Sequence, residues 1–131
     1  MYERRAGFAS APPGSNVEPP YVNILFTHAG HLRSGDVHVC EQLNHVVFGA
    51  LTLTQRLRGR DVVSRHVGGD VIRIPPHVPH LYSFDADTLM TEAWRTPSGA
   101  PCAFRAWLYA PYRARIPAAS AEKRFSVDNG G

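Results

Sequence analysis

The chain has 131 residues, of which 44% are hydrophobic and 19% charged, as expected for one globular domain rather than a disordered chain. Its net charge is +3, and the basic residues are scattered instead of gathered in runs, which argues against a nucleic-acid partner. No apolar run approaches the roughly 18 residues of a membrane helix, and no signal-peptide segment follows Met1. We therefore expect a cytoplasmic protein without a membrane partner.

The chain begins with a Pro-, Gly- and Ser-rich stretch, residues 1–20, that has no hydrophobic period. This composition predicts an extended arm or a disordered leader, and an arm of this kind could brace a homodimer. Two cysteines, Cys40 and Cys102, are too few for a disulfide framework. The sequence leaves a single bridge between them open without requiring it.

Residues 21–110 read as short β-like runs separated by turn signals. Runs of this length and spacing predict an all-β sandwich or barrel in a single domain. Residues 111–131 are expected to form a partly disordered C-terminal extension, with one or two helical turns over 117–125. The predicted strands are residues 21–28, 43–57, 62–67, 71–74, 80–84 and 88–94.

A rigid turn containing Pro75, Pro76 and Pro79 precedes His80. The spacing of Gly69, Pro75 and His80 resembles the second conserved motif of the cupins, Gly-x5-Pro-x-Gly-x2-His-x3-Asn. His77 stands at the second glycine of that motif, and Phe84 stands at the asparagine.

Residues 35–49, "GDVHVCEQLNHVVFG", resemble the first cupin motif, Gly-x5-His-x-His-x3-4-Glu-x6-Gly. Anchoring on Gly49 puts Gln42 at the glutamate, His38 at the second histidine and Asp36 at the first. The likeness covers about residues 30–95 and is greatest to small bacterial cupins of sugar and polysaccharide biosynthesis. It implies a cupin-like jelly-roll β-barrel in one domain.

The resemblance also implies a divalent metal, which cupins hold with three histidines and a glutamate. The corresponding ligands would be Asp36, His38, Gln42 and His80, a set that suits Fe, Zn, Mn or Ni. Gln42 would be a weak fourth ligand or a hydrogen-bond donor to substrate, and Glu41 could replace it if the hairpin register slipped. Two readings without metal stay open: both histidines line a cavity, and Asp36 caps a turn.

Further candidate residues follow from strand position. Glu92, a charged residue inside a predicted strand, is a candidate general base if it faces the barrel interior, and otherwise an exposed position. Tyr82 is a second candidate for moving a proton. Phe84 and Trp94 would line a substrate pocket or belong to the core. Arg33 could meet an anionic substrate or stand solvated on the surface; Arg73 is weighed in the same way, and His45 should face away from the cavity.

We therefore expect a small cupin enzyme that acts on a small polar metabolite by Lewis-acid chemistry, as an isomerase, epimerase, cyclase or lyase. Two alternatives remain open: an Fe(II)-dependent dioxygenase, and a non-catalytic cupin that binds or senses a small molecule. The expected partners are a small-molecule substrate and a second copy in a homodimer. Neither the fold nor the composition selects among these functions.

Overall fold

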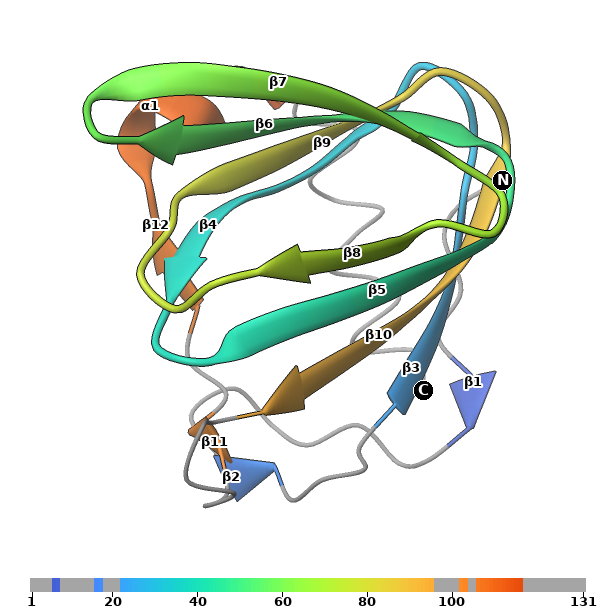
Figure 1. Cartoon of the computed structure of the whole chain (residues 1–131), viewed down its shortest axis with the longest axis horizontal. Helices are drawn as coiled ribbons and strands as arrows, with labels where there is room; N and C mark the ends of the chain where they lie inside the picture. The colour runs from blue at the N-terminus through green and yellow to red at the C-terminus, as the bar shows by residue number, and fades with distance from the viewer. Residues whose placement is uncertain (1–5, 8–15, 18–21, 96–101, 104–105, 117–131) are drawn as a thin grey trace.

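The structure is a computed structural model that describes residues 6–7, 16–17, 22–95, 102–103 and 106–116. Nearly all of this part of the chain is β-structure, in two antiparallel five-stranded sheets and a small two-stranded one. The first large sheet has the order β1-β3-β10-β5-β8, and the second has the order β12-β4-β9-β6-β7 (Figure 1). The helical turns predicted over 117–125 lie outside the described residues.

The elements have the following bounds: β1 Ala6–Gly7, β2 Asn16–Val17, β3 Val22–Thr27, β4 Leu32–His38, β5 Glu41–Phe48, β6 Ala50–Leu57, β7 Arg60–Val67, β8 Val71–Ile74, β9 His80–Phe84, β10 Thr88–Arg95, β11 Cys102–Ala103, β12 Ala106–Leu108 and α1 Ala110–Arg113.

The predicted strands 71–74 and 80–84 coincide with β8 and β9. The predicted run 43–57 is wrong as one strand, because the chain turns at Gly49 and passes from one sheet to the other. Gly49 has φ 109°, and a Cβ there would lie 2.4 Å from Thr88 Oγ1, so only glycine fits this corner. Strand β4 was missed because Ser34 and Gly35 interrupt its apolar alternation.

The core lies between the two sheets, where alternate side chains of both sheets meet. At one end of the barrel the interior is apolar, with Leu25, Val46, Leu51, Phe84 and Met90 in the main cluster. Toward the other end, where β4 and β8 end and β9 begins, the buried side chains become polar. A second, smaller cluster packs α1 and Ile116 against the outer side of β9.

The N-terminal arm contributes two short strands, and both pair within the same chain. Strand β1 pairs with β3, and β2 pairs with β11. Cys40 is disulfide-bonded, and Cys102 is the only other cysteine of the chain. Disulfides are rare in the reducing cytosol, so the cytoplasmic location stays a prediction.

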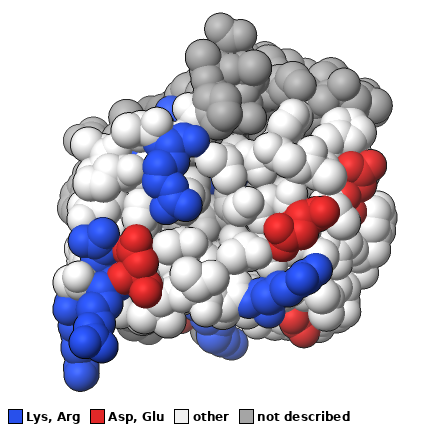
Figure 2. Space-filling model, turned by 90° about the horizontal axis from the view of Figure 1, so that it is seen from above, with Lys and Arg blue, Asp and Glu red and all other residues white. Residues whose placement is uncertain are grey.

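Charges of both signs share the surface. On the face seen in Figure 2, basic side chains have acidic ones near them, with uncharged surface between. No helix in the described part of the chain has the length and hydrophobicity that a membrane crossing requires.

Candidate metal and substrate site

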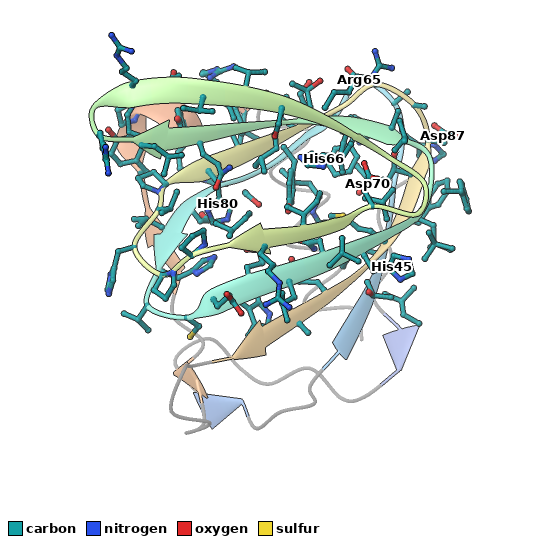
Figure 3. The ribbon with its side chains drawn as sticks, in the orientation of Figure 1. His45, Arg65, His66, Asp70, His80 and Asp87 are labelled. Atoms are coloured by element: carbon teal, nitrogen blue, oxygen red, sulfur yellow. The ribbon has the colours of Figure 1, made fainter. Side chains whose placement is uncertain are left out.

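Two histidines meet at the polar end of the barrel interior. His38 is the last residue of β4 and is 3% exposed; His80 is the first residue of β9 and is fully buried. Their ring centroids are 4.9 Å apart. His80 follows the proline-containing turn and projects between the two sheets (Figure 3). The stiff turn therefore ends at a buried, interior histidine.

Both imidazoles are held by their Nδ1 atoms. The Nδ1–H of His38 donates to the carbonyl oxygen of Cys40 at 3.0 Å, and that of His80 donates to the carbonyl oxygen of Val78 at 2.9 Å. A carbonyl oxygen can only accept, so each Nδ1 carries the proton. In a neutral imidazole the Nε2 atom then has a free lone pair.

Gln42 stands between the two Nε2 atoms. Its Oε1 lies 2.9 Å from His38 Nε2 and 3.1 Å from His80 Nε2, and the residue is 1% exposed. Both histidines therefore present a nitrogen to one carbonyl oxygen.

A chain of hydrogen bonds fixes the orientation of this amide. Asn44 Nδ2 donates to the carbonyl oxygen of Thr91 at 3.2 Å, so Asn44 Oδ1 faces the other way. Gln42 Nε2 donates to this Oδ1 at 2.7 Å, and the hydroxyl of Tyr82 donates to it at 2.5 Å. Turning the Gln42 amide over would set two carbonyl oxygens against each other. Its Oε1 must therefore face the histidines.

With both imidazoles neutral, three electron-pair donors thus converge. Two imidazolium ions would satisfy the geometry, but their mutual repulsion at 4.9 Å is ~3 kcal/mol at an effective dielectric constant of 20. One divalent cation would accept a lone pair from each of the three atoms, and imidazole nitrogen suits the transition metals that cupin-like sites would bind. His38, His80 and Gln42 are therefore the residues that would hold a metal here.

Asp36 and Arg33 both enter the barrel because β4 bulges between them. Ser34 and Gly35 both have φ 71°, and the register with β9 shifts there. Arg33 is opposite Tyr82, Asp36 is opposite His80, and the two residues are 5% and 6% exposed. The surface position considered for Arg33 is thus wrong, whereas Asp36 lies beside a candidate ligand.

Among the residues that the structure describes, no three His, Cys, Asp or Glu side chains gather closely enough to hold a metal. The converging set therefore consists of two histidines and the amide of Gln42, and the ligand role of Asp36 stays a prediction. Glu41, the alternative to Gln42, points outward to an exposed contact of 3.3 Å with Arg73.

Glu92 and Tyr82 lie one layer deeper than the histidines. Glu92 is 7% exposed, on the same face of the sheet as Asn44, its partner in β5. Burial raises the pKa of Tyr82 well above its usual value, and the negative charge of Glu92 raises it further. Arg33 opposes this shift in the pKa, so both charges act on the Tyr82 hydroxyl within the barrel.

The two other aromatic candidates have different surroundings. Trp94 packs edge-on against His38, with ring centroids 4.5 Å apart, and so lies beside the candidate ligands. Phe84 belongs to the main apolar cluster, next to Tyr82 at 6.0 Å. Trp94 thus lies next to the candidate ligands, and Phe84 lies farther from them, in the apolar core.

One departure from the cupin motifs has a visible consequence in the backbone. His77, which stands at a glycine position of the motif, has φ 65° and adopts the left-handed conformation that glycine would adopt easily.

Asn44 was not predicted as a site residue, although it orients Gln42. Its even spacing from Gln42 along β5, which puts both side chains on one face of the strand, is the signal that could have revealed it. His45 is exposed on the opposite face of β5.

By sequence, the chain matches no protein-family model and no curated protein. Solved structures do share its fold. An oxalate decarboxylase mutant (OxdC) of Bacillus subtilis has a TM-score of 0.57 and 16% identity, over 81% of this chain and 28% of that one. The DMSP lyase DddQ of Ruegeria pomeroyi has a TM-score of 0.50 and 19% identity, over 58% of this chain and 38% of that one.

A third similar structure is the CENP-C cupin domain of Drosophila melanogaster, with a TM-score of 0.51 and 18% identity. The alignment covers 59% of this chain and 62% of that domain, which has also been solved bound to CAL1. The proteins that share this fold therefore include two enzymes and a domain that binds a protein. At these identities the likeness establishes the fold alone.

Proposed function

The chain has the cupin fold, and from that premise we propose that it binds one divalent metal ion and acts as an enzyme on a small polar metabolite. The observation that carries the proposal is the convergence of His38 Nε2, His80 Nε2 and Gln42 Oε1. The two Nδ1 atoms and Gln42 Nε2 have hydrogen-bond partners of their own, and the three converging atoms would donate lone pairs to the cation. Asp36, opposite His80, is the nearest candidate for a carboxylate ligand.

The chemistry that we propose is of the isomerase, epimerase, cyclase or lyase type. The ion, when bound, would supply Lewis-acid polarisation of a substrate oxygen. The backbone carbonyls that hold the two imidazoles, and Asn44, which holds Gln42, would keep these side chains oriented before substrate arrives. Such support makes a site rigid at the atoms where geometry matters most.

Glu92 is our candidate for the proton-transferring group. It is a buried carboxylate on the interior face, one layer from the histidines. Tyr82 is less suited to act as a base, because its raised pKa keeps the phenol protonated and its hydroxyl already donates to Asn44. Tyr82 would instead orient the amide pair, and Glu92 would accept and return the proton.

A non-catalytic binding cupin is the second candidate. The observation that favours it is the lack, among the described residues, of a three-residue His, Cys, Asp or Glu group. The CENP-C cupin, solved bound to CAL1, illustrates binding by a protein of this fold. In this case His38, His80 and Gln42 would hold a ligand or a proton in place of a metal.

Metal content distinguishes these functions. Untagged protein should be purified, stripped with EDTA, reloaded with Co²⁺ and analysed for metal per chain. We expect about one tightly held ion, and Gln42→Met, which keeps the volume but removes the carbonyl oxygen, should hold less. Iron in the protein as purified would favour the dioxygenase. A chain that neither contains nor takes up metal would refute the enzyme proposal in favour of the binding cupin.

A further inference from the structure

A second group of polar side chains lies in strand β7 and the turn that follows it. Its members are Ser64, His66 and Asp70. Ser64 Oγ lies 2.8 Å from His66 Nε2, and Asp70 Oδ2 lies 3.7 Å from His66 Nδ1. A hydroxyl, an imidazole and a carboxylate in this order have the arrangement of a Ser-His-Asp triad, which is recognised by geometry and not by order along the chain.

The hydroxyl and the imidazole lie on the inner face of β7. Ser64 and His66 share a face because they are two residues apart in a strand. They pair with Leu53 and Leu51 of β6, which belong to the main apolar cluster. Among the described residues β7 is the edge of its sheet, and the side chain of His66 is 21% exposed. The pair thus borders the apolar core and can be reached from solvent.

The contact with Asp70 sets the tautomer of His66. A carboxylate can only accept a hydrogen bond, so it favours the proton on the nearby Nδ1 atom. The Nε2 atom then has a lone pair, and the Ser64 hydroxyl donates to it at 2.8 Å. This is the polarity that a general base needs toward a nucleophile. When His66 takes up the serine proton, its positive charge strengthens the contact with Asp70.

Hydrogen bonds hold Asp70 in place behind the imidazole. The N–H of Val67 donates to Asp70 Oδ2 at 2.9 Å, and the N–H of Asp70 donates to the carbonyl oxygen of Val67 at 3.0 Å. The N–H of Val46 donates to the carbonyl oxygen of Asp70 at 2.9 Å, which ties the turn to β5. The carboxylate is therefore positioned before any substrate arrives.

A backbone N–H is available for the oxygen of a substrate carbonyl. Gly68 N–H donates to Gly49 O, directly beyond the Ala50–Val67 pair. Since bonded and non-bonded pairs alternate in an antiparallel ladder, the odd-numbered residues of β7 direct their N–H groups away from β6. The N–H of Arg65 therefore points to the edge of the sheet, directly after Ser64 in the chain. The residue after the nucleophile supplies an oxyanion donor in other serine hydrolases.

This group is separate from the two histidines described above. Leu51 pairs with both His66 and Phe84, so these three residues form one row across the second sheet. Phe84 is four residues from His80 along β9, a distance of about 13 Å. Figure 3 likewise shows His66 and Asp70 close together and away from His80. The chemistry of this group does not involve the candidate metal ligands.

We propose that Ser64, His66 and Asp70 form a second active site, which hydrolyses short, uncharged carboxylic esters. Val62, the preceding residue on the same face, is apolar and 43% exposed. It lies about 6.5 Å along the strand from Ser64, which suits an acyl chain of roughly two to four carbons. Apolar surroundings favour an uncharged ester over a charged one.

The reaction has two steps. Ser64 Oγ forms a bond to the ester carbonyl carbon while its proton passes to His66 Nε2, and the oxyanion faces the N–H of Arg65. The bond to the alcohol then breaks, and the alcohol leaves with the proton from His66. In the second step His66 takes a proton from water, whose oxygen attacks the acyl group. The carboxylic acid departs, and the proton returns to Ser64. Asp70 is a positioning residue in both steps.

Labelling of the full chain with diisopropyl fluorophosphate in the presence of EDTA tests the proposal. An activated serine displaces fluoride and gains one phosphoryl group, which intact-mass analysis and peptide mapping detect. We expect one group per chain, on Ser64, together with hydrolysis of p-nitrophenyl butyrate, and Ser64→Ala should lose both. His66→Gln should lower both rates about 100-fold or more, the usual contribution of a general base.

Asp70→Asn separates positioning from structure, because its amide oxygen can still accept from the N–H of Val67. It should keep the melting temperature and lower the labelling rate about tenfold or more. Ser83→Ala is the matched control, since Ser83 is a half-buried serine of the same sheet. It should react as the unmodified chain does.

Several outcomes would overturn the proposal: no label, a label on another residue, labelling without ester hydrolysis, or rates unchanged by His66→Gln. An unchanged rate in Asp70→Asn would contradict the role of Asp70. Because EDTA is present throughout, these results do not depend on metal. The metal measurement described under the proposed function is therefore decided separately.

Discussion

Replacing His80 by alanine separates its packing role from its metal role. His80 is fully buried, and its Nδ1–H donates to the carbonyl oxygen of Val78. Losing this hydrogen bond, at about 1 kcal/mol, and leaving a void where the imidazole packed should lower the free energy of unfolding of the metal-free protein by about 2–3 kcal/mol. For a domain of this size that corresponds to a fall in melting temperature of about 10 °C.

The metal adds a second, independent quantity. An ion present at 100 times its dissociation constant stabilises the folded state by about 2.7 kcal/mol. The unmodified chain should therefore melt about 10 °C higher when Co²⁺ is present at that excess, and His80→Ala should lose this increment entirely. Scanning calorimetry with and without Co²⁺ measures both quantities.

His45→Ala is the matched control for this experiment, because His45 is exposed on the outer face of β5. It should keep both the melting temperature and the Co²⁺ increment of the unmodified chain. If His80→Ala kept the full increment, His80 would not be a ligand. If His45→Ala lost it, the ion would be bound at the surface.

Three further predictions concern the hairpin, the barrel corner and the C-terminal contact. Asp36→His, which restores the residue usual in cupins, should retain or tighten Co²⁺ binding; a lower melting temperature with unchanged Co²⁺ affinity would show that Asp36 only caps a turn. Gly49→Ala should lower the free energy of unfolding by at least about 2 kcal/mol in urea denaturation, because the new Cβ would strike Thr88 at a φ of 109°. Burial and the hydrogen bond to Asp61 raise the pKa of Tyr112 to about 12, above an ordinary value near 10. The stabilisation linked to this raised pKa is complete below pH 10 and is lost as the pH rises to about 12. Over that interval the urea midpoint of Tyr112→Phe should therefore fall less than that of the unmodified chain.

Much of the barrel could be predicted from local pattern. Alternating apolar residues and turn signals located β8 and β9 at their observed bounds, because alternation with period two is a property of a single strand. The spacing of Gly69, Pro75 and His80 predicted a rigid turn directly before His80. The structure has this turn between β8 and β9, and His80, the first residue of β9, is buried. The resemblance to the cupins rested on such local spacing, and it led to the fold that the structural comparisons support.

The structure was needed wherever a residue's role depends on another strand. The orientation of Gln42 depends on Asn44 and Thr91, and Thr91 lies 47 positions from Asn44 in the chain. Arg33 enters the barrel only because a bulge at Ser34 and Gly35 shifts its parity relative to Asp36. Period-two reasoning places residues 33 and 36 on opposite faces, since an odd spacing reverses the side of a regular strand. The sequence alone thus determined which polar residues are available. Only the packing of β4, β5 and β9 decided which of their atoms face one another. The reason is that hydrogen bonds and charges depend on distances in space, and the distance between two strands cannot be read from the spacing of residues along the chain.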